Sequence, residues 1–395
     1  MTVTSIQKLS DTPIDRARAL VPMLRQHGQE IARAARLPDS VMQEIRDAGL
    51  MQLARPRYYG GPEVGMDVIL RIATELAKGD GSAGWVYAVT NSHDHLVGLY
   101  PKEVQDEYWA SAEPLCASSY LPTGKAKKVN GGYILSGKWP FCSGIDFCGW
   151  IAIGGFIEMT EGGNTIQDLR FFMIEKSQIR VIDDWQVMGL SGTGSKSILC
   201  EDLFVPEIRA LRNADIANGA TPGADLHDNP MYRTSIWPLF GFSILAPATG
   251  IARGAYEVLV EDFRQRAVSD PNFESRRVAT QMHLAEVSAL IEASELLYAR
   301  DLEETFALVS ARIPLSDQIR VRNRRDEAFL AGLCRKALDI MMSMSGGRGL
   351  REEGVVQRGF RDIIAVSNHP GGNWDSASAS FGSVLFGGRP TELTS

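Results

Sequence analysis

The sequence predicts a mainly helical α+β protein in which a central β-domain separates two helical regions. Apolar residues recur at three- and four-residue spacing over long stretches before residue 112 and after residue 236. Between these stretches, short apolar runs at 151–153 and 171–174 alternate with Gly-rich turns, as strands do. We therefore expect an N-terminal helical domain at 1–112, a central β-barrel-like domain at 113–208 and a C-terminal domain at 209–395 that forms a four-helix bundle.

The N-terminal region has the pattern of four helices. Apolar residues from Ile14 to Leu24 follow helical spacing, and Pro38 marks the start of a second helix. The expected helices span 13–37, 38–50, 66–78 and 82–99. Small residues at 79–84, just before Trp85, separate the last two, and we interpret them as a place where helices pack closely.

The central region is expected to begin with a β-hairpin. Apolar and polar residues at 125–129 and 133–135 flank Asn130-Gly131-Gly132, which accept the positive φ of a tight turn. A second turn is expected at Gly162-Gly163-Asn164. Residues 213–230 are rich in Ala, Gly, Asp and Asn without periodicity, so we expect a surface loop or lid there.

The C-terminal region contains three long helical patterns and a short one. They span 237–268, 273–309, 315–344 and 374–385. In the second, Val287, Ile291 and Tyr298 belong to a stripe that recurs at three and four residues, as in a helix with one buried face. A four-helix bundle is the expected packing.

Composition excludes several classes of partner. The 395 residues carry a formal net charge of −7 and no Lys/Arg run, so we expect neither nucleic-acid nor membrane binding. The five cysteines are odd in number and lack a C-x-x-C pair, which favours a reducing compartment over a disulfide framework. Because no apolar run approaches about 18 residues, we expect a cytoplasmic protein.

Two polar turns in the β-domain are the main candidates for a functional site. The first is W-P-F-C-S-G at 139–144, and the second is G-L-S-G-T-G-S-K at 189–196, followed by D-L-F-V-P-E at 202–207. The second turn fails as a phosphate-binding P-loop because Ser195 stands where that motif has lysine and no helix is expected after it. A flat cofactor lying between the sheet and the helices is the functional interpretation, and a tight turn that needs glycine only for its conformation is the alternative.

The two turns, together with R-D-I-I-A-V-S-N-H at 361–369, resemble an acyl-CoA dehydrogenase-like family. More narrowly, they resemble the oxygenase components of the group D two-component flavin-dependent monooxygenases. The resemblance extends over nearly the whole chain. It implies an acyl-CoA dehydrogenase-like fold.

The same resemblance implies the chemistry. We expect diffusible reduced FAD or FMN, with FAD preferred, supplied by a separate NAD(P)H-dependent flavin reductase, because the chain has no G-x-G-x-x-G fingerprint for a nicotinamide nucleotide. O2 would form a flavin hydroperoxide that hydroxylates a small aromatic substrate, which is phenolic, indolic or otherwise heteroaromatic. N-hydroxylation of an amine is a further option. A homotetramer is the family's usual assembly.

Three residues are assigned catalytic roles by the resemblance. Ser143 would lie beside the reactive edge of the flavin ring, and His93 and His369 would orient and activate the substrate. The alternatives are a serine that satisfies its own turn and histidines with ordinary capping or surface roles. A metal is not expected, because His93 and His95 are two residues apart on a helix and so do not face one another.

Other residues would hold the flavin or the substrate. Trp139 and Phe141, with Trp150, would wall the flavin pocket, and the hydroxyl of Thr193 or Ser195 would contact the flavin. Residues from a neighbouring subunit would bind the flavin's adenylate or pyrophosphate; these are Arg276, Gln281, Gly346 and Gly347. The alternative for either of the two segments that contain them is a helix stop.

The substrate side is expected around the segment Ser118-Ser119-Tyr120. One of the two serines would bind the substrate hydroxyl, and the sequence does not decide which. Arg233 would pair with a substrate carboxylate or with the reduced flavin, and a plain surface salt bridge is its alternative.

Two other functions stay open at the level of sequence. An acyl-CoA dehydrogenase with tightly bound FAD would need a carboxylate base, but Pro370 stands where many such enzymes have glutamate. A non-catalytic flavin-fold binding protein is the second alternative, and the polar residues that converge on the expected cleft argue against it.

Overall fold

The N-terminal region is helical, as predicted. The computed structural model describes residues 12–161, 164–270 and 273–391. The helices of this region are α2 Pro13–Ala34, α3 Asp39–Asp47, α4 Met66–Gly79, α5 Gly81–Val97 and α6 Lys102–Ala110. Asp80 caps α5 by accepting a hydrogen bond from the backbone N–H of Ala83. Every residue of α5 is buried, because it lies between α4, α8 and strand β1.

The central domain is one seven-stranded sheet. Its strands are β1 Cys116–Val129, β2 Gly132–Cys142, β3 Trp150–Glu161, β4 Asn164–Glu175, β5 Arg180–Ile182, β6 Lys196–Pro206 and β7 Ala210–Arg212. They follow the order β5-β6-β2-β1-β3-β4-β7, in which only β1 and β3 pair in parallel. The β1–β2 hairpin turns at Gly131, with φ +78°, as predicted. Of the second predicted turn, Gly162 and Gly163 lie outside the described residues, and Asn164 begins β4.

The sheet is buried on both faces at the start of β3. Ile151 and Ile153 belong to a core enclosed by the sheet itself, whereas Ala152, between them, belongs to the core shared with the helices. This two-residue alternation is the geometry of a strand. The helix-facing side places β1 against α5, and that contact builds the candidate site.

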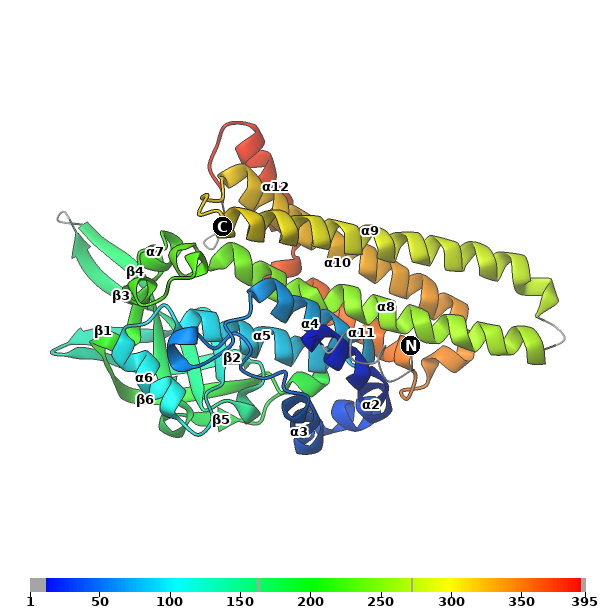
Figure 1. Ribbon diagram of the computed structural model, residues 1–395, viewed down its shortest axis with the longest axis horizontal. Coiled ribbons are helices and arrows are strands. Elements are labelled where there is room, and N and C mark those ends of the chain that lie inside the picture. The colour runs from blue at the N-terminus through cyan, green and yellow to red at the C-terminus, as the bar shows by residue number, and fades with distance from the viewer. Residues whose placement is uncertain (1–11, 162–163, 271–272, 392–395) are drawn as a thin grey trace, which may run out of the picture.

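The C-terminal region is a bundle whose fourth helix differs from the one predicted. Its long helices are α8 Trp237–Ser269, α9 Arg277–Ser310 and α10 Asp317–Ser345, followed by α11 Val355–Asn368 and α12 Trp374–Leu385. The three long helices run away from the sheet, which occupies the other end of the molecule (Figure 1). The fourth bundle helix is α11, which packs on α8 and α10, whereas the predicted fourth helix, α12, packs on α10. The sequence analysis missed α11 because Arg358 and Asp362 lie on its buried face and interrupt the apolar pattern.

The prediction of an irregular surface loop at 213–230 is wrong in part. The segment begins with a short helix, α7 Asn213–Ala217. Thr221 and His227 are buried, and the ring of His227 lies 4.3 Å from that of Tyr232. The segment is therefore packed into the protein over part of its length.

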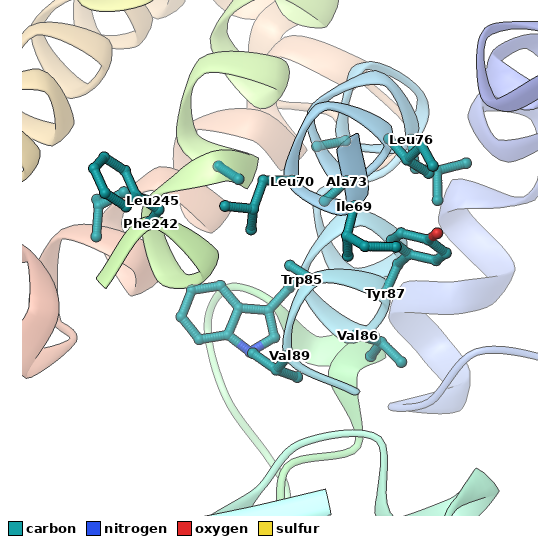
Figure 2. Packing of buried hydrophobic residues seen from close by; sticks show 14 of the residues in the cluster. Ile69, Leu70, Ala73, Leu76, Trp85, Val86, Tyr87, Val89, Phe242 and Leu245 are labelled. Atoms are coloured by element: carbon teal, nitrogen blue, oxygen red, sulfur yellow. The ribbon is translucent and has the colours of Figure 1, made fainter. Parts of the chain in front are cut away.

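The helices share one core around α4, α5 and α8. Figure 2 shows Leu70 and Ala73 of α4, Trp85 and Val89 of α5, and Phe242 of α8 within it. In the described part of the chain, no helix has both the length and the hydropathy needed to cross a membrane. The boundaries proposed for the three domains stay predictions.

Candidate functional site

The two polar turns singled out in the sequence meet in space. The turn after β2 contains Ser143, and the loop at 189–195, which we call the β5–β6 loop, contains Thr193 and Ser195. The backbone N–H of Gly144 donates to the carbonyl oxygen of Thr193 at 2.9 Å. Two segments that lie about fifty residues apart in the sequence therefore form one structure.

A chain of hydroxyl groups runs through this junction. The Oγ atoms of Ser143 and Ser195 lie 2.7 Å apart, and those of Ser195 and Thr193 (Oγ and Oγ1) 2.6 Å apart. Thr193 donates its single hydroxyl proton to the carbonyl oxygen of Leu190 at 2.8 Å. Because a carbonyl can only accept, Ser195 must donate to Thr193, and Ser143 must donate to Ser195.

The direction of these hydrogen bonds determines which proton and lone pairs of the Ser143 hydroxyl are in use. The indole Nε1–H of Trp85 donates to Ser143 Oγ at 3.1 Å. A hydroxyl has one proton and two acceptor lone pairs, so Ser143 has used its proton and one lone pair. Its second lone pair is left to accept a hydrogen bond from a ligand.

Trp85 is a functional residue that the sequence analysis missed. Its ring lies 5.5 Å from that of His369 in an edge-to-face arrangement, so it joins Ser143 to the C-terminal histidine. It lies near the start of α5, and Figure 2 shows it on the same side of the helix as Val89. The only signal in the sequence was a single large aromatic side chain directly after a run of small residues.

His369 is held in one tautomer. Its Nδ1 accepts a hydrogen bond from the backbone N–H of Gly371 at 2.9 Å, so the ring proton is on Nε2. Arg324 donates to the carbonyl oxygens of Pro370 and Gly371 and so fixes this turn. Burial, together with the nearby charge of Arg324, lowers the pKa of His369 to about 4. The ring is therefore neutral near pH 7 and presents an N–H donor.

His93 is held in the opposite tautomer. Its Nδ1 lies 2.7 Å from the carbonyl oxygen of Cys116, and its Nε2 lies 3.0 Å from Ser118 Oγ. The carbonyl can only accept, so Nδ1 bears the proton and Nε2 accepts from Ser118. Burial lowers the pKa of His93 to about 4. The pair thus resembles a hydroxyl and base dyad whose imidazole stays neutral.

The structure separates the two candidate serines of β1. Ser118 donates to His93, whereas Ser119 is buried and donates to the carbonyl oxygen of Pro140 at 2.7 Å. Tyr120 is half-buried, and its ring contacts those of His93 and Phe240 at 5.8 and 5.9 Å. Ser118, which is the less buried of the two serines and is joined to His93, is therefore the serine better placed to meet a substrate.

The two polar clusters lie along one strip between α5 and α8. Trp85, Val89 and His93 are four residues apart and so share a face of α5. On α8, Phe240 contacts the ring of His93 at 5.7 Å, and Ile244 lies against Gly371, next to His369. Eight residues of helix span about 12 Å, which is the separation along α5 of Trp85 and His93.

Three predicted site residues lie elsewhere. Trp139 is fully buried in the interior of the sheet and donates to the carbonyl oxygen of Gly154 at 2.7 Å, so its side chain does not wall this site. Trp150 is buried beside Tyr108 and donates to Ser111. Arg233 forms a 3.0 Å salt bridge with the exposed Asp225, which is the alternative named for it.

Phe141 is the aromatic residue that does border the site. It has a φ of +64°, and 58% of its side chain is exposed. Its ring packs edge-to-face on Trp185 at 6.1 Å, and Met188, directly before the β5–β6 loop, is also exposed. A bulky residue with positive φ is rare and is held by its surroundings, so an apolar rim is fixed beside Ser143.

One cavity, away from Ser143, gathers most of the residues expected to meet the cofactor from another subunit. It has a volume of about 590 Å³ and is lined by Arg276, Gly346 and Gly347, together with Arg266 and Arg348. Gln281 lies on the exposed face of α9 and does not line it. The cavity's lining residues come from the end of α8, the segment before and at the start of α9, and the end of α10, and these helix ends lie away from the sheet (Figure 1). Along α8, Ile244 and Phe263 are separated by about 28 Å.

The described residues contain no group of three His, Cys, Asp or Glu side chains placed to hold a metal ion. His93 and His95 point to different neighbours, since His95 stacks on Tyr232 at 4.7 Å.

Comparison with known proteins defines the class. A family model described as the acyl-CoA dehydrogenase N-terminal domain matches residues 15–111, and one described as the acyl-CoA dehydrogenase C-terminal domain matches residues 242–374. The crystal structure of 3-HSA hydroxylase from Rhodococcus sp. RHA1 is similar, with a TM-score of 0.91 and 29% identity over 96% of this chain and 98% of that chain. The fold is therefore that of an acyl-CoA dehydrogenase-like protein.

Two curated relatives narrow the class. The pigment production hydroxylase of Rhodococcus sp. strain ATCC 21145 is 31% identical over 376 residues, which are 93% of this chain and 95% of the relative. The oxygenase component of the FADH(2)-dependent resorcinol hydroxylase of Rhizobium sp. strain MTP-10005 is 28% identical over 388 residues, which are 95% and 94% of the two chains. The chain belongs to the oxygenase components of flavin-dependent monooxygenases, and the resemblance seen in its sequence is confirmed.

Proposed function

We propose that this chain is the oxygenase component of a two-component monooxygenase that uses reduced flavin and O2 to hydroxylate a small aromatic compound. The observation that carries the proposal is the free acceptor of Ser143, at the end of a directed hydroxyl chain and one aromatic ring away from His369. The names of the relatives, which describe a FADH(2)-dependent resorcinol hydroxylase and a pigment production hydroxylase, support the same activity.

The residues around Ser143 suit a reduced flavin. Its free lone pair would accept a hydrogen bond from an N–H of the reduced ring, while Thr193 and Ser195 hold Ser143 in place. The exposed rim of Phe141 and Met188 offers apolar surface that a flat ring would cover. When bound, the flavin supplies the electrons that activate O2. The contribution of the chain is to orient the ring and to exclude water.

Ser118 and His93 suit the hydroxyl group of a phenolic substrate. A phenol O–H would donate to Ser118 Oγ, which in turn donates to His93 Nε2. With a pKa of about 4, His93 is too weak a base to hold a proton from a resting phenol, whose pKa is about 10. The pair therefore polarises the O–H bond and takes up its proton only as the ring loses electron density to oxygen.

Acyl-CoA dehydrogenation is disfavoured by the same site. The turn where many such enzymes place a glutamate base is His369-Pro370-Gly371, and its carbonyl groups are engaged by Arg324. The groups that converge on the strip between α5 and α8 are hydroxyls and neutral imidazoles.

We further propose that the chain prefers FAD to FMN and that it assembles as a homotetramer. The Arg276 cavity lies too far along the bundle to serve the same chain's Ser143 site, so a second copy would bring it there. An exposed apolar stripe of α9 offers the contact surface. It consists of Val278, Met282, Ala285, Ala289, Ala293 and Leu296. A separate NAD(P)H-dependent flavin reductase would supply the reduced flavin.

The test is direct. The purified protein is mixed anaerobically with chemically reduced FAD or FMN and a panel of phenols, indoles and aromatic amines, and O2 is then admitted. We expect a hydroxylated product with at least one compound and little free hydrogen peroxide. A preparation that stays firmly yellow and is reduced by an acyl-CoA would identify a dehydrogenase instead, and one that binds no flavin would leave only a binding protein.

A further inference from the structure

Three elements that build the proposed flavin site meet at one buried cluster of charged residues. Asp80, Arg358 and Asp362 are 2%, 5% and 4% exposed. Asp80 precedes α5, and the other two lie on α11. Arg358 Nε lies 3.5 Å from Asp80 Oδ2, and Asp362 is one helical turn after Arg358 on the same face.

Each carboxylate of the cluster holds a segment that leads to the hydroxyl chain. Asp80 accepts from the backbone N–H of Ala83 at 3.1 Å, two residues before Trp85. Asp362 Oδ1 accepts from the backbone N–H of Leu190 at 2.7 Å, and the carbonyl oxygen of Leu190 receives the proton of Thr193. The hydroxyl chain begins at Trp85 and ends at Leu190, and each of these residues is thus close to a segment that the cluster holds.

Glycine residues in the surrounding segments leave room for this charged cluster. A Cβ on Gly28 of α2 would lie 2.2 Å from Arg358 Nη2, and a Cβ on Gly81 would lie 2.8 Å from Asp362 Oδ2. Gly189 is pressed against the carbonyl of Arg361, at 2.0 Å from an added Cβ. The glycines therefore serve close packing around the charges, which explains their place in the sequence better than turn conformation alone.

Stability alone does not account for two carboxylates and one guanidinium in the interior. Burial raises the pKa of Asp362 to about 7, and the carboxyl of Asp80 contributes to the rise. Well-packed apolar residues commonly stabilise such a position as well as a buried ion pair does. Hydrogen bonds, unlike apolar contacts, fix the direction of the groups they hold.

We propose that Asp362, supported by Arg358 and Asp80, is a positioning residue that orients Leu190 and thereby fixes the hydroxyl chain so that Ser143 presents its free acceptor to the flavin. The effect on the flavin reaction rests on the proposed function, whereas the hydrogen bonding of Asp362 to Leu190 does not. In this proposal Asp362 touches neither flavin nor substrate and acts through Leu190, Thr193 and Ser195. Helix α11 leads directly into His369. Asp362 therefore connects the two partners of Trp85, which are Ser143 on one side and His369 on the other.

The experiment compares Asp362→Ala and Asp362→Asn with a matched control, Asp168→Asn. Asp168 is also a buried carboxylate with two arginine partners, Arg170 and Arg212. It lies on β4, however, and Arg212 lies on the neighbouring edge strand β7. Hydrogen exchange of the β5–β6 loop is measured first, without flavin. Product formed per O2 consumed is measured second, with kcat and KM for the aromatic substrate.

We expect Asp362→Ala to raise the exchange rate of the Leu190 amide about tenfold or more, because a charge-assisted hydrogen bond is lost. The product yield per O2 should fall several-fold with little change in KM, and the remainder should appear as hydrogen peroxide. Asp362→Asn keeps an oxygen for Leu190 and should recover most of both. The control should lose stability without either effect.

Equal exchange and equal yield in Asp362→Ala and the control would overturn the proposal. If Asp362→Ala does not fold, Gly81→Ala, which displaces Asp362 Oδ2, is compared with Gly332→Ala, which meets no atom within 4 Å; the same two readouts decide. If the wild-type protein gives no hydroxylated product, the proposed function fails, whereas the exchange measurement still tests the positioning role by itself.

Discussion

Ser143 differs from Ser119 and Ser294 because it is only half-buried, so a ligand can reach the acceptor lone pair that its own hydrogen bonds leave unused. Ser294, for example, donates to its own helix at the carbonyl of Ile291, and Ser119 donates to Pro140. Ser143 passes its proton to Ser195 and receives one from Trp85. The sequence indicated the importance of Ser143 and His369 through their motifs, but it gave no basis for their hydrogen-bond directions, which depend on Trp85, Thr193 and Leu190.

Replacing Ser143 with alanine removes the acceptor that the account assigns to the flavin. We expect Ser143→Ala to convert most of the O2 consumed into hydrogen peroxide, with the yield of hydroxylated product falling about tenfold or more, the cost of one lost hydrogen bond to a reactive group. The measurement is product and peroxide per O2. Ser294→Ala is the matched control and should couple as well as the wild type; identical coupling in both variants would rule out the role of Ser143.

Ser118 and Ser119 allow a sharper comparison, because they are neighbours on β1. Ser118→Ala should raise KM for a phenolic substrate and lower kcat, by about tenfold in kcat/KM. Ser119→Ala should mainly reduce stability, by about 1 kcal/mol, through its lost bond to Pro140. Steady-state kinetics and chemical denaturation separate the two. A larger loss of kcat/KM in Ser119→Ala would show that the wrong serine was chosen.

His93 gives a prediction for pH. Its pKa is about 4 in the folded protein and about 6.5 when unfolded. Between these values the unfolded state binds a proton that the folded state does not, so its contribution to stability falls as the pH is lowered. From pH 7 to pH 5 the loss is about 2 kcal/mol.

Histidine-to-asparagine substitution at this position removes that titration. The free energy of unfolding lost through His93→Asn should therefore be about 2 kcal/mol smaller at pH 5 than at pH 7. Denaturant unfolding at the two pH values is the measurement, with Ser294→Ala as a variant that keeps the wild-type dependence. A cost that is the same at both pH values would contradict the buried, neutral state of His93.

At the scale of elements, the β5–β6 loop owes its shape to close contact with helices. A Cβ on Gly192 would lie 2.1 Å from Ile31 Cγ2 of α2 and 3.0 Å from Ser82 Cβ of α5. Gly194 has a φ of +55°, so it needs glycine for its backbone conformation. The sequence analysis could weigh only the second reason, because helix contacts are not visible in a turn motif.

Gly192→Ala should therefore destabilise the protein by about 1–3 kcal/mol, as overpacking does. Gly332, on α10, meets nothing within 4 Å of an added Cβ, and Gly332→Ala should be neutral or stabilise by up to about 1 kcal/mol. Thermal or denaturant unfolding measures both. Equal stability of the two variants would be inconsistent with the packing described here.

Elements were predictable where periodicity was clear. The long helices α8, α9 and α10 and the β1–β2 hairpin lie where the sequence places them, because they bury regular apolar stripes or contain strong turn residues. Helix α11 was missed since its buried face includes Arg358 and Asp362. The same two residues are those to which we assign a positioning role, so the failure of the pattern coincides with a proposed functional contact.

At the scale of the whole molecule, the two sites of one chain lie at opposite ends of the bundle. The sequence identified Arg276 and Gly346 only through resemblance, and the fold brings both to one cavity. In the proposed assembly, a second copy would place this cavity beside a Ser143 site. Assembly is therefore the part of the account that neither sequence periodicity nor the fold of one chain determines.

Arg276→Ala tests that assembly. If a neighbouring copy's Arg276 binds the outer phosphate of FAD, the variant should bind reduced FAD about tenfold more weakly, with little change for reduced FMN, since one charge-assisted hydrogen bond is lost. Arg264→Ala is the control, because Arg264 is 74% exposed and lies outside the cavity. Equal weakening for FAD and FMN, or a monomer in light scattering, would refute the shared site.

The most direct test of the central claim follows the oxygen atom. Wild-type protein and Ser143→Ala are given chemically reduced FAD, an accepted aromatic substrate and isotopically labelled O2, and the products are analysed by mass spectrometry. We predict one labelled oxygen atom in the product of the wild type, and labelled hydrogen peroxide in place of most of that product for Ser143→Ala. Unlabelled product, or no oxygenated product from any aromatic compound tried, would contradict the account.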